Sequence, residues 1–292
     1  MHTLPELKDK EFGGAWSVHD TETVQAVKRY TVPYQNVDVQ KFLQDYAEWA
    51  IDGHDINGIK EYSHYSYSNG TTETFDKFYQ FNAGRRLRLW HGEYFYHQIQ
   101  AREMFNKNFA WIDDDDIKLM DVVVVSAPFS DTGNTPENFD NVMLQCESLG
   151  VPVLVDMAYL NLTKNFNIDL SYKCIHTVTT SLSKVFPVET HRIGIRMNRH
   201  NIDDTLSAYS NNSFPYVNTT GVYVGQEMIK NYSNDWLYNK YKNLQQEYCK
   251  KLNVVPSNCV IFGIDVDNKF DQYNRGSNTN RLCFSKVWDQ RN

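Results

Sequence analysis

The chain has 292 residues, of which 41% are hydrophobic and 22% are charged. This composition is typical of a globular protein and excludes a disordered tail, a collagen-like repeat and a coiled-coil rod. The net charge of −7 argues against a general nucleic-acid binder, because neutralising phosphates requires clustered Lys and Arg. No apolar run approaches the roughly 20 residues that span a bilayer, and the first residues lack the apolar core of a signal peptide. We therefore expect a cytoplasmic protein with no membrane or nucleic-acid partner.

The first elements expected along the chain are two helices. Val37–Ile51 has apolar residues at helical spacing, which predicts an amphipathic helix. A second helix is expected directly after Asn69-Gly70, because Thr and Glu suit a first helical turn beside the positive end of the dipole.

The clearest architecture lies in the middle of the chain. Asp121–Val125 is a continuous β-branched run, as expected for a strand that is buried on both faces. Thr135 and Pro136 predict the N-cap and first residue of a helix, and Gly150 predicts its end. Val151–Val155 is the next buried strand. This strand–helix–strand order predicts a βαβ unit and hence a parallel sheet.

The pattern changes after Met197. Before this residue two strands are expected, at Cys174–Thr179 and Arg192–Met197. After it we expect two helices, at Thr219–Tyr232 and Asn234–Leu252, and then two strands, at Cys259–Ile264 and Arg281–Val287. Helices followed by strands indicate a small α+β subdomain. We predict an N-terminal segment (1–60) that packs on both domains, a large α/β domain (61–205) with a mostly parallel sheet, and a reduced C-terminal domain (206–292).

The five cysteines are scattered and never form a CxxC pair, so neither a disulfide framework nor a zinc site is expected. We interpret them as small buried hydrophobic residues, and we expect no metal site.

Two predicted strand ends carry polar residues. Asp156 follows one buried strand, with Tyr159 close behind it. Ser181, Ser183 and Lys184 surround the exit of another strand. Ligands of open parallel sheets bind beyond the carboxyl ends of the strands, so these two groups are expected to meet at one site. Taken singly, such an acid is usually a cap or a loop residue, and such a lysine usually lies on the surface.

These residues resemble the fold-type I pyridoxal-phosphate (PLP) enzymes, and within them the class I/II aminotransferases of the aspartate and histidinol-phosphate type. Asp156-Met157-Ala158-Tyr159 matches the Asp-x-Ala-Tyr of that family. Ser181-Leu182-Ser183-Lys184, followed by Arg192, matches its Ser-x-Ser-Lys and distant Arg. The resemblance extends more faintly from about Tyr67 to Phe284, and 292 residues is short for the family. It implies PLP as the cofactor.

The resemblance also implies roles for these residues. Lys184 would form a Schiff base with the cofactor aldehyde and then carry the α-proton of the substrate. Asp156 would keep the pyridine nitrogen protonated, and Tyr159 would donate a hydrogen bond to the phenolic oxygen. Ser181 and Arg192 would hold the phosphate. Ser183 would either help them or serve only the local structure.

Further cofactor contacts are implied upstream. Gly70, Thr71 and Thr72 would bind the phosphate at the start of the predicted helix, where backbone N–H groups are free, although an ordinary capped helix also explains this turn. Tyr94 would stack on the cofactor ring, with Tyr96 as the second choice and core packing as the alternative for both.

Two positions complete the expected site. Arg281 would grip the substrate α-carboxylate, and a surface salt bridge is the alternative. Ser130 stands where the family has an asparagine that contacts the cofactor oxygen, so this contact would be weak or mediated by water.

The predicted function is amino-group transfer between an α-amino acid and a 2-oxo acid in a homodimer. The alternatives are another PLP-dependent reaction, catalysed by a lyase, racemase or decarboxylase, and an inactive binding protein of the same fold.

Overall fold

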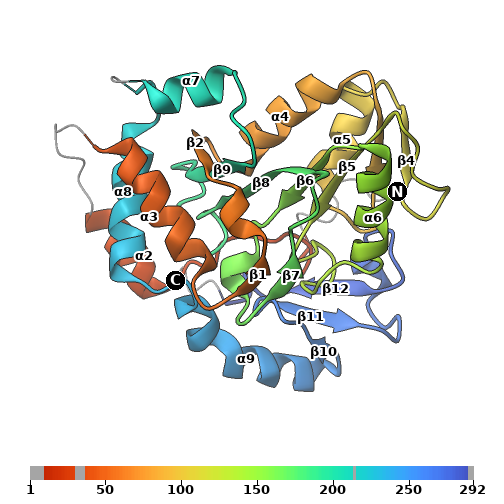
Figure 1. Cartoon of the computed structure of the whole chain (residues 1–292). Coiled ribbons are helices and arrows are strands. Elements are labelled where there is room, and N and C mark those ends of the chain that lie inside the picture. The colour runs from red at the N-terminus through yellow and green to blue at the C-terminus, as the bar shows by residue number, and fades with distance from the viewer. Residues whose placement is uncertain (1–9, 30–36, 213–214, 289–292) are drawn as a thin grey trace.

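The computed structural model describes residues 10–29, 37–212 and 215–288 (Figure 1). Within these ranges a seven-stranded sheet forms the centre of the molecule, in the strand order β2-β9-β8-β6-β5-β3-β4. The chain is therefore an α/β protein, as predicted. The strands are β2 (His64–Ser68), β3 (Arg86–Leu89), β4 (Phe109–Trp111), β5 (Asp121–Ser126), β6 (Val153–Asp156), β8 (Ile175–Ser181) and β9 (Gly194–Asn198).

The sheet is mostly parallel, since only β9 runs against its neighbours β2 and β8. The predicted βαβ unit is confirmed: β5 and β6 are parallel neighbours, and α6 (Phe139–Leu149) connects them in the chain. The register aligns Ser126 with Asp156, and Ser181 with Gly194. The strand ends that carry polar residues therefore lie at one edge of the sheet.

The start of α6 (Phe139–Leu149) differs from the prediction. The helix begins three residues after Pro136, because Asn138 takes a left-handed conformation with φ of 56°. Tertiary contacts hold the preceding turn: Trp90 Nε1 donates to the carbonyl of Glu137, and Thr135 Oγ1 donates to a carbonyl of β7 (Asn167–Asp169). The predicted end is confirmed, since Gly150 is the left-handed C-cap.

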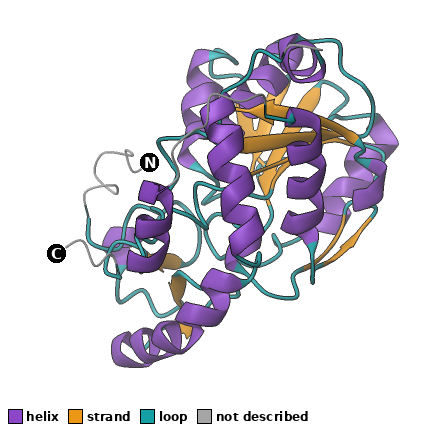
Figure 2. Ribbon diagram, turned by 90° about the vertical axis from the view of Figure 1, so that its left-hand side faces the viewer, coloured by secondary structure: helices purple, strands orange, loops and turns teal. Residues whose placement is uncertain are grey.

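Helices lie on both sides of the sheet (Figure 2). α4 (Thr71–Asn82) and α5 (Phe95–Glu103) enclose one apolar core with alternate residues of β5, such as Val122 and Val124. The larger core lies on the other face, where Val123 and Val125 pack with residues of α3 (Val39–Ile51), α6 and α8 (Thr219–Asn231). All five cysteines are buried and unbridged, as expected.

The remaining helices are α2 (Thr21–Arg29), α3 (Val39–Ile51), α7 (Thr205–Asn211), α8 (Thr219–Asn231) and α9 (Trp236–Leu252). α8 packs against α3, and α7 packs against β2. No helix of the described ranges is long and apolar enough to cross a membrane.

The C-terminal part forms a separate antiparallel sheet of β10 (Val255–Pro256), β11 (Phe262–Asp265) and β12 (Asn280–Cys283), seen below the main sheet in Figure 1. β11 begins later than predicted because Cys259–Phe262 forms a turn, and β12 ends earlier than predicted because the chain turns between Phe284 and Trp288. A two-stranded pair joins β1 (Asp55–Asn57) to β7. The three-part domain division stays a prediction, and residues 1–9 and 30–36 of its first segment lie outside the described ranges.

Candidate active site

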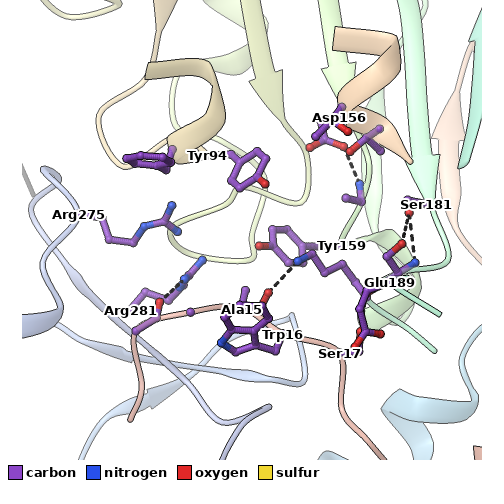
Figure 3. A pocket seen from close by; sticks show the side chains of 18 of the residues that line it. Ala15, Trp16, Ser17, Tyr94, Asp156, Tyr159, Ser181, Glu189, Arg275 and Arg281 are labelled. Atoms are coloured by element: carbon purple, nitrogen blue, oxygen red, sulfur yellow. Dashed lines mark hydrogen bonds between the residues drawn. The ribbon is translucent and has the colours of Figure 1, made fainter. Parts of the chain in front are cut away.

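A cavity of about 310 Å³ lies beyond the carboxyl ends of β6 and β8 (Figure 3). This volume is at the lower end of the range of about 300–1,000 Å³ for small-molecule sites. Most of the site residues predicted from sequence line it: Thr71, Thr72, Tyr94, Asp156, Tyr159, Ser181, Ser183, Lys184, Arg192 and Arg281. Gly70 and Ser130 are not part of this lining.

Lys184 enters the cavity from the turn after β8. Its Nζ donates a hydrogen bond of 2.7 Å to the carbonyl of Ala15. Burial lowers the pKa of Lys184, and the nearby Arg281 acts in the same direction. A larger share of this amine is therefore uncharged near neutral pH than for an exposed lysine, which makes it a better nucleophile and base.

Asp156 is the last residue of β6 and is only 3% exposed. Its carboxylate accepts a hydrogen bond of 3.0 Å from the backbone N–H of Ala158, and no Lys, Arg or His of the described chain lies within ion-pair distance. Burial raises the pKa of Asp156 to about 7, although the hydrogen bond from Ala158 opposes this shift. The site thus holds a buried acid without a cationic partner, which suits a ligand that carries a protonated nitrogen.

The edge of the cavity at α4 is suited to a phosphate. The helix begins after Gly70 and no side chain caps it, so the backbone N–H groups at its N-terminus are free and the positive end of its dipole is open. Arg192 lies beside this helix start, where its Nη2 donates 2.9 Å to Thr72 Oγ1 and 3.0 Å to the carbonyl of Asn69.

Gly70 allows this close approach. Its φ is 76°, and a Cβ at this position would collide with the guanidinium group of Arg192. Arg192 itself has a left-handed φ of 54°, a costly conformation for a residue other than glycine. The backbone at both positions therefore serves to bring a guanidinium group and a helix N-terminus together.

Ser181 and Ser183 form the wall between this edge and Lys184. The hydroxyl of Ser181 lies 2.9 Å from that of Ser183 and 3.0 Å from the carbonyl of Ile193. Both hydroxyls are therefore held in place by the chain itself.

The structure distinguishes the two tyrosines near the start of α5. Tyr94 lines the cavity and meets the ring of His97 edge-on at 5.6 Å. Tyr96 does not line it; its hydroxyl donates a hydrogen bond of 2.5 Å to Asp76. Tyr159 lies on the other wall, edge-on to Phe262 with ring centroids 5.2 Å apart.

Arg281 and Ser130 meet at the end of the cavity next to the C-terminal sheet. Arg281 is 3% exposed, and its Nη1 donates 2.6 Å to the carbonyl of Ser130. It makes no ion pair within the part of the chain that the structure describes, so the alternative of a surface salt bridge does not apply. The hydroxyl of Ser130 lies 3.2 Å from Nη1 of Arg275, which also lines the cavity.

Solved structures with a similar fold are enzymes that use PLP or are named for reactions on amino acids. A PLP-bound C-S lyase from Staphylococcus hominis aligns with a TM-score of 0.67 at 11% identity, over 98% of this chain and 88% of that chain. The histidinol-phosphate aminotransferase from Clostridium acetobutylicum aligns with a TM-score of 0.62 at 11% identity, over 94% and 95%. L-threonine-O-3-phosphate decarboxylase from Porphyromonas gingivalis aligns with a TM-score of 0.57 at 15% identity, over 93% of this chain and 96% of that chain.

The chain has the fold of the fold-type I PLP enzymes. No protein-family model matches the sequence, and no curated protein matches it either. The predicted resemblance in fold is thus confirmed, whereas the reaction is open, because the three similar structures have different activities and identities of 15% or less.

Several residues that line the cavity were missed in the sequence. The segment Gly13–Ser17 crosses the cavity, and Ser17 Oγ donates 2.7 Å to the carbonyl of Ser183. Glu189 lies beside it and pairs with His19 at 2.8 Å. Arg275 was also missed. None of these residues belongs to a motif. The sequence offered only their positions as a signal: Arg275 lies six residues before Arg281, and Glu189 lies five residues after Lys184.

Proposed function

We propose that this protein is a PLP-dependent enzyme that moves an amino group between an α-amino acid and a 2-oxo acid. One observation carries the proposal: Lys184, with its lowered pKa, and the unpaired Asp156 line the same cavity as the uncapped start of α4. A lysine amine, an acid and a phosphate-binding edge are the three groups that this cofactor needs from a protein.

The described residues fit the cofactor at each end. Asp156 would accept a hydrogen bond from its ring nitrogen, and this cationic partner would compensate the buried carboxylate. The backbone N–H groups of Thr71 and Thr72, together with Arg192, would hold its phosphate. Tyr94 would cover one face of the ring and Tyr159 would donate to its oxygen. For Ser130 the geometry offers no direct support, because its hydroxyl is held by Arg275.

When bound, PLP supplies an aldehyde carbon for the lysine amine and a ring that accepts electrons from the substrate. Lys184 would bind it covalently and then take the α-proton of the substrate and return it to another atom. To do so, Nζ must leave the carbonyl of Ala15, which holds it in this structure. Arg281 would orient the substrate through its α-carboxylate.

The first test asks whether Lys184 holds the cofactor. The purified protein is mixed with PLP, its visible absorbance is recorded, and after borohydride reduction the modified peptide is identified by mass spectrometry. We expect a visible band and a cofactor mass on Lys184; Lys184→Ala has neither. The exposed Lys173 provides the matched control, since Lys173→Ala keeps both. A colourless wild-type protein, or a modification at another lysine, contradicts the proposal.

A second candidate is a lyase or decarboxylase reaction, because similar structures carry these names. The loaded protein is given one amino acid at a time without a 2-oxo acid. A transferase releases one equivalent of 2-oxo acid per subunit and then stops, and a 2-oxo acid restores the original absorbance. Continuous product release without a second substrate favours the alternative.

We also propose that the protein is a homodimer, as the resemblance implies. Sedimentation equilibrium of the loaded protein measures this directly, and a monomeric mass contradicts it.

A further inference from the structure

Glu93 is a buried carboxylate that directly precedes Tyr94, a residue of the cavity wall (Figure 3). Its exposed fraction is 0%. Across residues 10–29, 37–212 and 215–288, the carboxylate of Glu93 forms no salt bridge. A buried carboxylate without a salt bridge is costly, so its polar contacts are of interest.

The carboxylate of Glu93 accepts three hydrogen bonds. Its Oε1 accepts 2.6 Å from the backbone N–H of Tyr94 and 2.6 Å from the hydroxyl of Ser126, and its Oε2 accepts 2.8 Å from the backbone N–H of Ser126. Glu93 also lies just before the first turn of α5, where the positive end of the helix dipole favours a negative charge. These contacts favour the ionised form, which only accepts hydrogen bonds.

Ser126 connects Glu93 to another part of the cavity. The hydroxyl of Ser126 accepts 2.7 Å from the backbone N–H of Ser130, and the carbonyl of Ser130 accepts 2.6 Å from Arg281. Glu93 therefore joins the start of α5 to the end of β5 and to the loop that holds Arg281.

Glu93 also lies near Asp156. Ser126 and Asp156 end neighbouring parallel strands in register, so their side chains leave the same face of the sheet. This is the face of α4 and α5, because Val124 and Leu154, two residues earlier in each strand, belong to the core on that face. Burial raises the pKa of Asp156 to about 7, and the charge of Glu93 acts in the same direction.

Other titratable groups face Glu93 from three further segments. Burial raises the pKa of Glu93, whereas its hydrogen bonds and the charge of Arg275 lower it; Arg275 Nη2 lies 3.5 Å from the backbone carbonyl of Glu93. On α4, burial raises the pKa of Tyr79, and Glu93 and Asp156 act in the same direction. The remaining groups are His97 on α5, which contacts Tyr79, and Asp131, which packs against Gly92. Arg275 thus offsets the charge of Glu93 in part.

We propose that Glu93 is a positioning residue of the cofactor site, which fixes Tyr94 at the cavity wall and places a second negative charge near Asp156. This inference rests on the proposed function, in which Tyr94 covers the cofactor ring and Asp156 pairs with its nitrogen. A second negative charge favours a protonated ring nitrogen, because opposite charges attract strongly in a buried site. Glu93 acts through these two residues and does not line the cavity itself.

Glu93→Gln tests the charge, because it keeps the size of the side chain and the oxygen that accepts from Tyr94. Urea unfolding of the cofactor-free protein is measured at pH 4 and pH 8 for the wild type, Glu93→Gln, Asp156→Asn and the double variant. At pH 8 the two carboxylates repel each other, and each single substitution removes this repulsion. The stability gain of the double variant should therefore be smaller than the sum of the single changes at pH 8, and equal to it at pH 4, where Asp156 is protonated.

A purely structural role of Glu93 would not make this difference depend on pH. Additive changes at both pH values, or the same deviation at both, therefore contradict the inference. Glu103, the exposed last residue of the same helix, supplies the control: Glu103→Gln with Asp156→Asn should be additive at both pH values.

Glu93→Asp tests the position, because it keeps the charge but shortens the side chain by one carbon and withdraws the carboxylate from Tyr94. Absorbance titration should show that it binds PLP about 3- to 10-fold more weakly than the wild type, the effect of one lost hydrogen bond. Glu103→Gln should bind PLP like the wild type. If Glu93→Asp binds PLP as tightly as the wild type, the inference is wrong. This variant also provides a test if Glu93→Gln does not fold.

The failure of the proposed function is separate from these outcomes. Visible absorbance of the wild type with PLP is measured first. If the wild type takes no cofactor, the proposed function fails, and the unfolding measurements on the cofactor-free protein still show whether the charges of Glu93 and Asp156 interact.

Discussion

On the sheet side of the cavity, Asp156 and Ser181 end neighbouring strands, and Arg192 lies two residues before the next one. On the side formed by the antiparallel strands β11 and β12, here called the hairpin side, Arg275 and Arg281 are held by carbonyls of Ser130 and Gly13, which belong to distant parts of the chain. The sheet side contains a buried acid, Asp156, without a salt bridge to a cation. The hairpin side contains the buried Arg281 and the partly buried Arg275, and within the described residues neither forms a salt bridge with a carboxylate. The two sides of one cavity thus differ in which kind of group lacks a salt bridge, an acid on the sheet side and guanidinium groups on the hairpin side.

This difference teaches how each side is specified. Strand register alone brings Ser126 beside Asp156 and Ser181 beside Gly194, so the sheet side follows from local pattern. The hairpin side needs three segments to meet, and its hydrogen bonds connect residues more than one hundred positions apart.

The largest expected effect is on stability, at Asp156. The pKa of about 7 in the folded protein lies above the usual value of 3.8, so the folded state binds more protons and wild-type stability falls as pH rises from about 4 to about 7. Asp156→Asn removes this loss. We expect it to stabilise the cofactor-free protein by up to about 4 kcal/mol at pH 8 and by little at pH 4.

Urea unfolding of the cofactor-free protein at several pH values measures this effect. The exposed Asp203 gives the matched control, because Asp203→Asn leaves the sheet side of the cavity untouched. A gain from Asp156→Asn that does not change with pH would show that the carboxylate is not the cause. The same variant should bind PLP more weakly, since it loses the partner of the ring nitrogen.

The next effect separates the two sides by ligand. Arg192→Gln should weaken PLP binding by about 10- to 100-fold, because it removes one charged contact with the phosphate, and it should leave the binding of a simple carboxylate such as butyrate nearly unchanged. Arg281→Gln should weaken the binding of the carboxylate ligand and leave PLP binding nearly unchanged. Absorbance titration with PLP and calorimetry with butyrate measure the two affinities for each variant. If both variants weaken both ligands equally, the two sides do not act as independent sites.

The smallest effect tests the backbone of the sheet side. Gly70→Ala places a Cβ at a φ of 76° and against Arg192, and we expect it to cost about 1–2 kcal/mol of stability. PLP binding should weaken as well, because Arg192 must move. Gly84→Ala is the control, since a Cβ there meets no atom within 4 Å. Equal stability losses in the two variants would contradict the role assigned to Gly70.

The sequence-based predictions succeeded where short segments decide the structure. The β-branched run of β5, the glycine that ends α6, and the groups around Asp156 and Lys184 all lie as expected. They failed where distant contacts override local preference. The helix predicted from Pro136 begins at Phe139 because Trp90 holds the carbonyl of Glu137.

The sequence by itself determined the α/β order, the sheet edge that carries Asp156 and Lys184, and the resemblance to the fold-type I enzymes. These features depend on periodicity and on motifs of a few adjacent residues. Only the tertiary structure decided that Tyr94 rather than Tyr96 lines the cavity, and that Arg275 joins Arg281 there. The physical reason is that guanidinium groups are held here by backbone carbonyls, and every residue has a carbonyl, so no residue type in the sequence marks the partner.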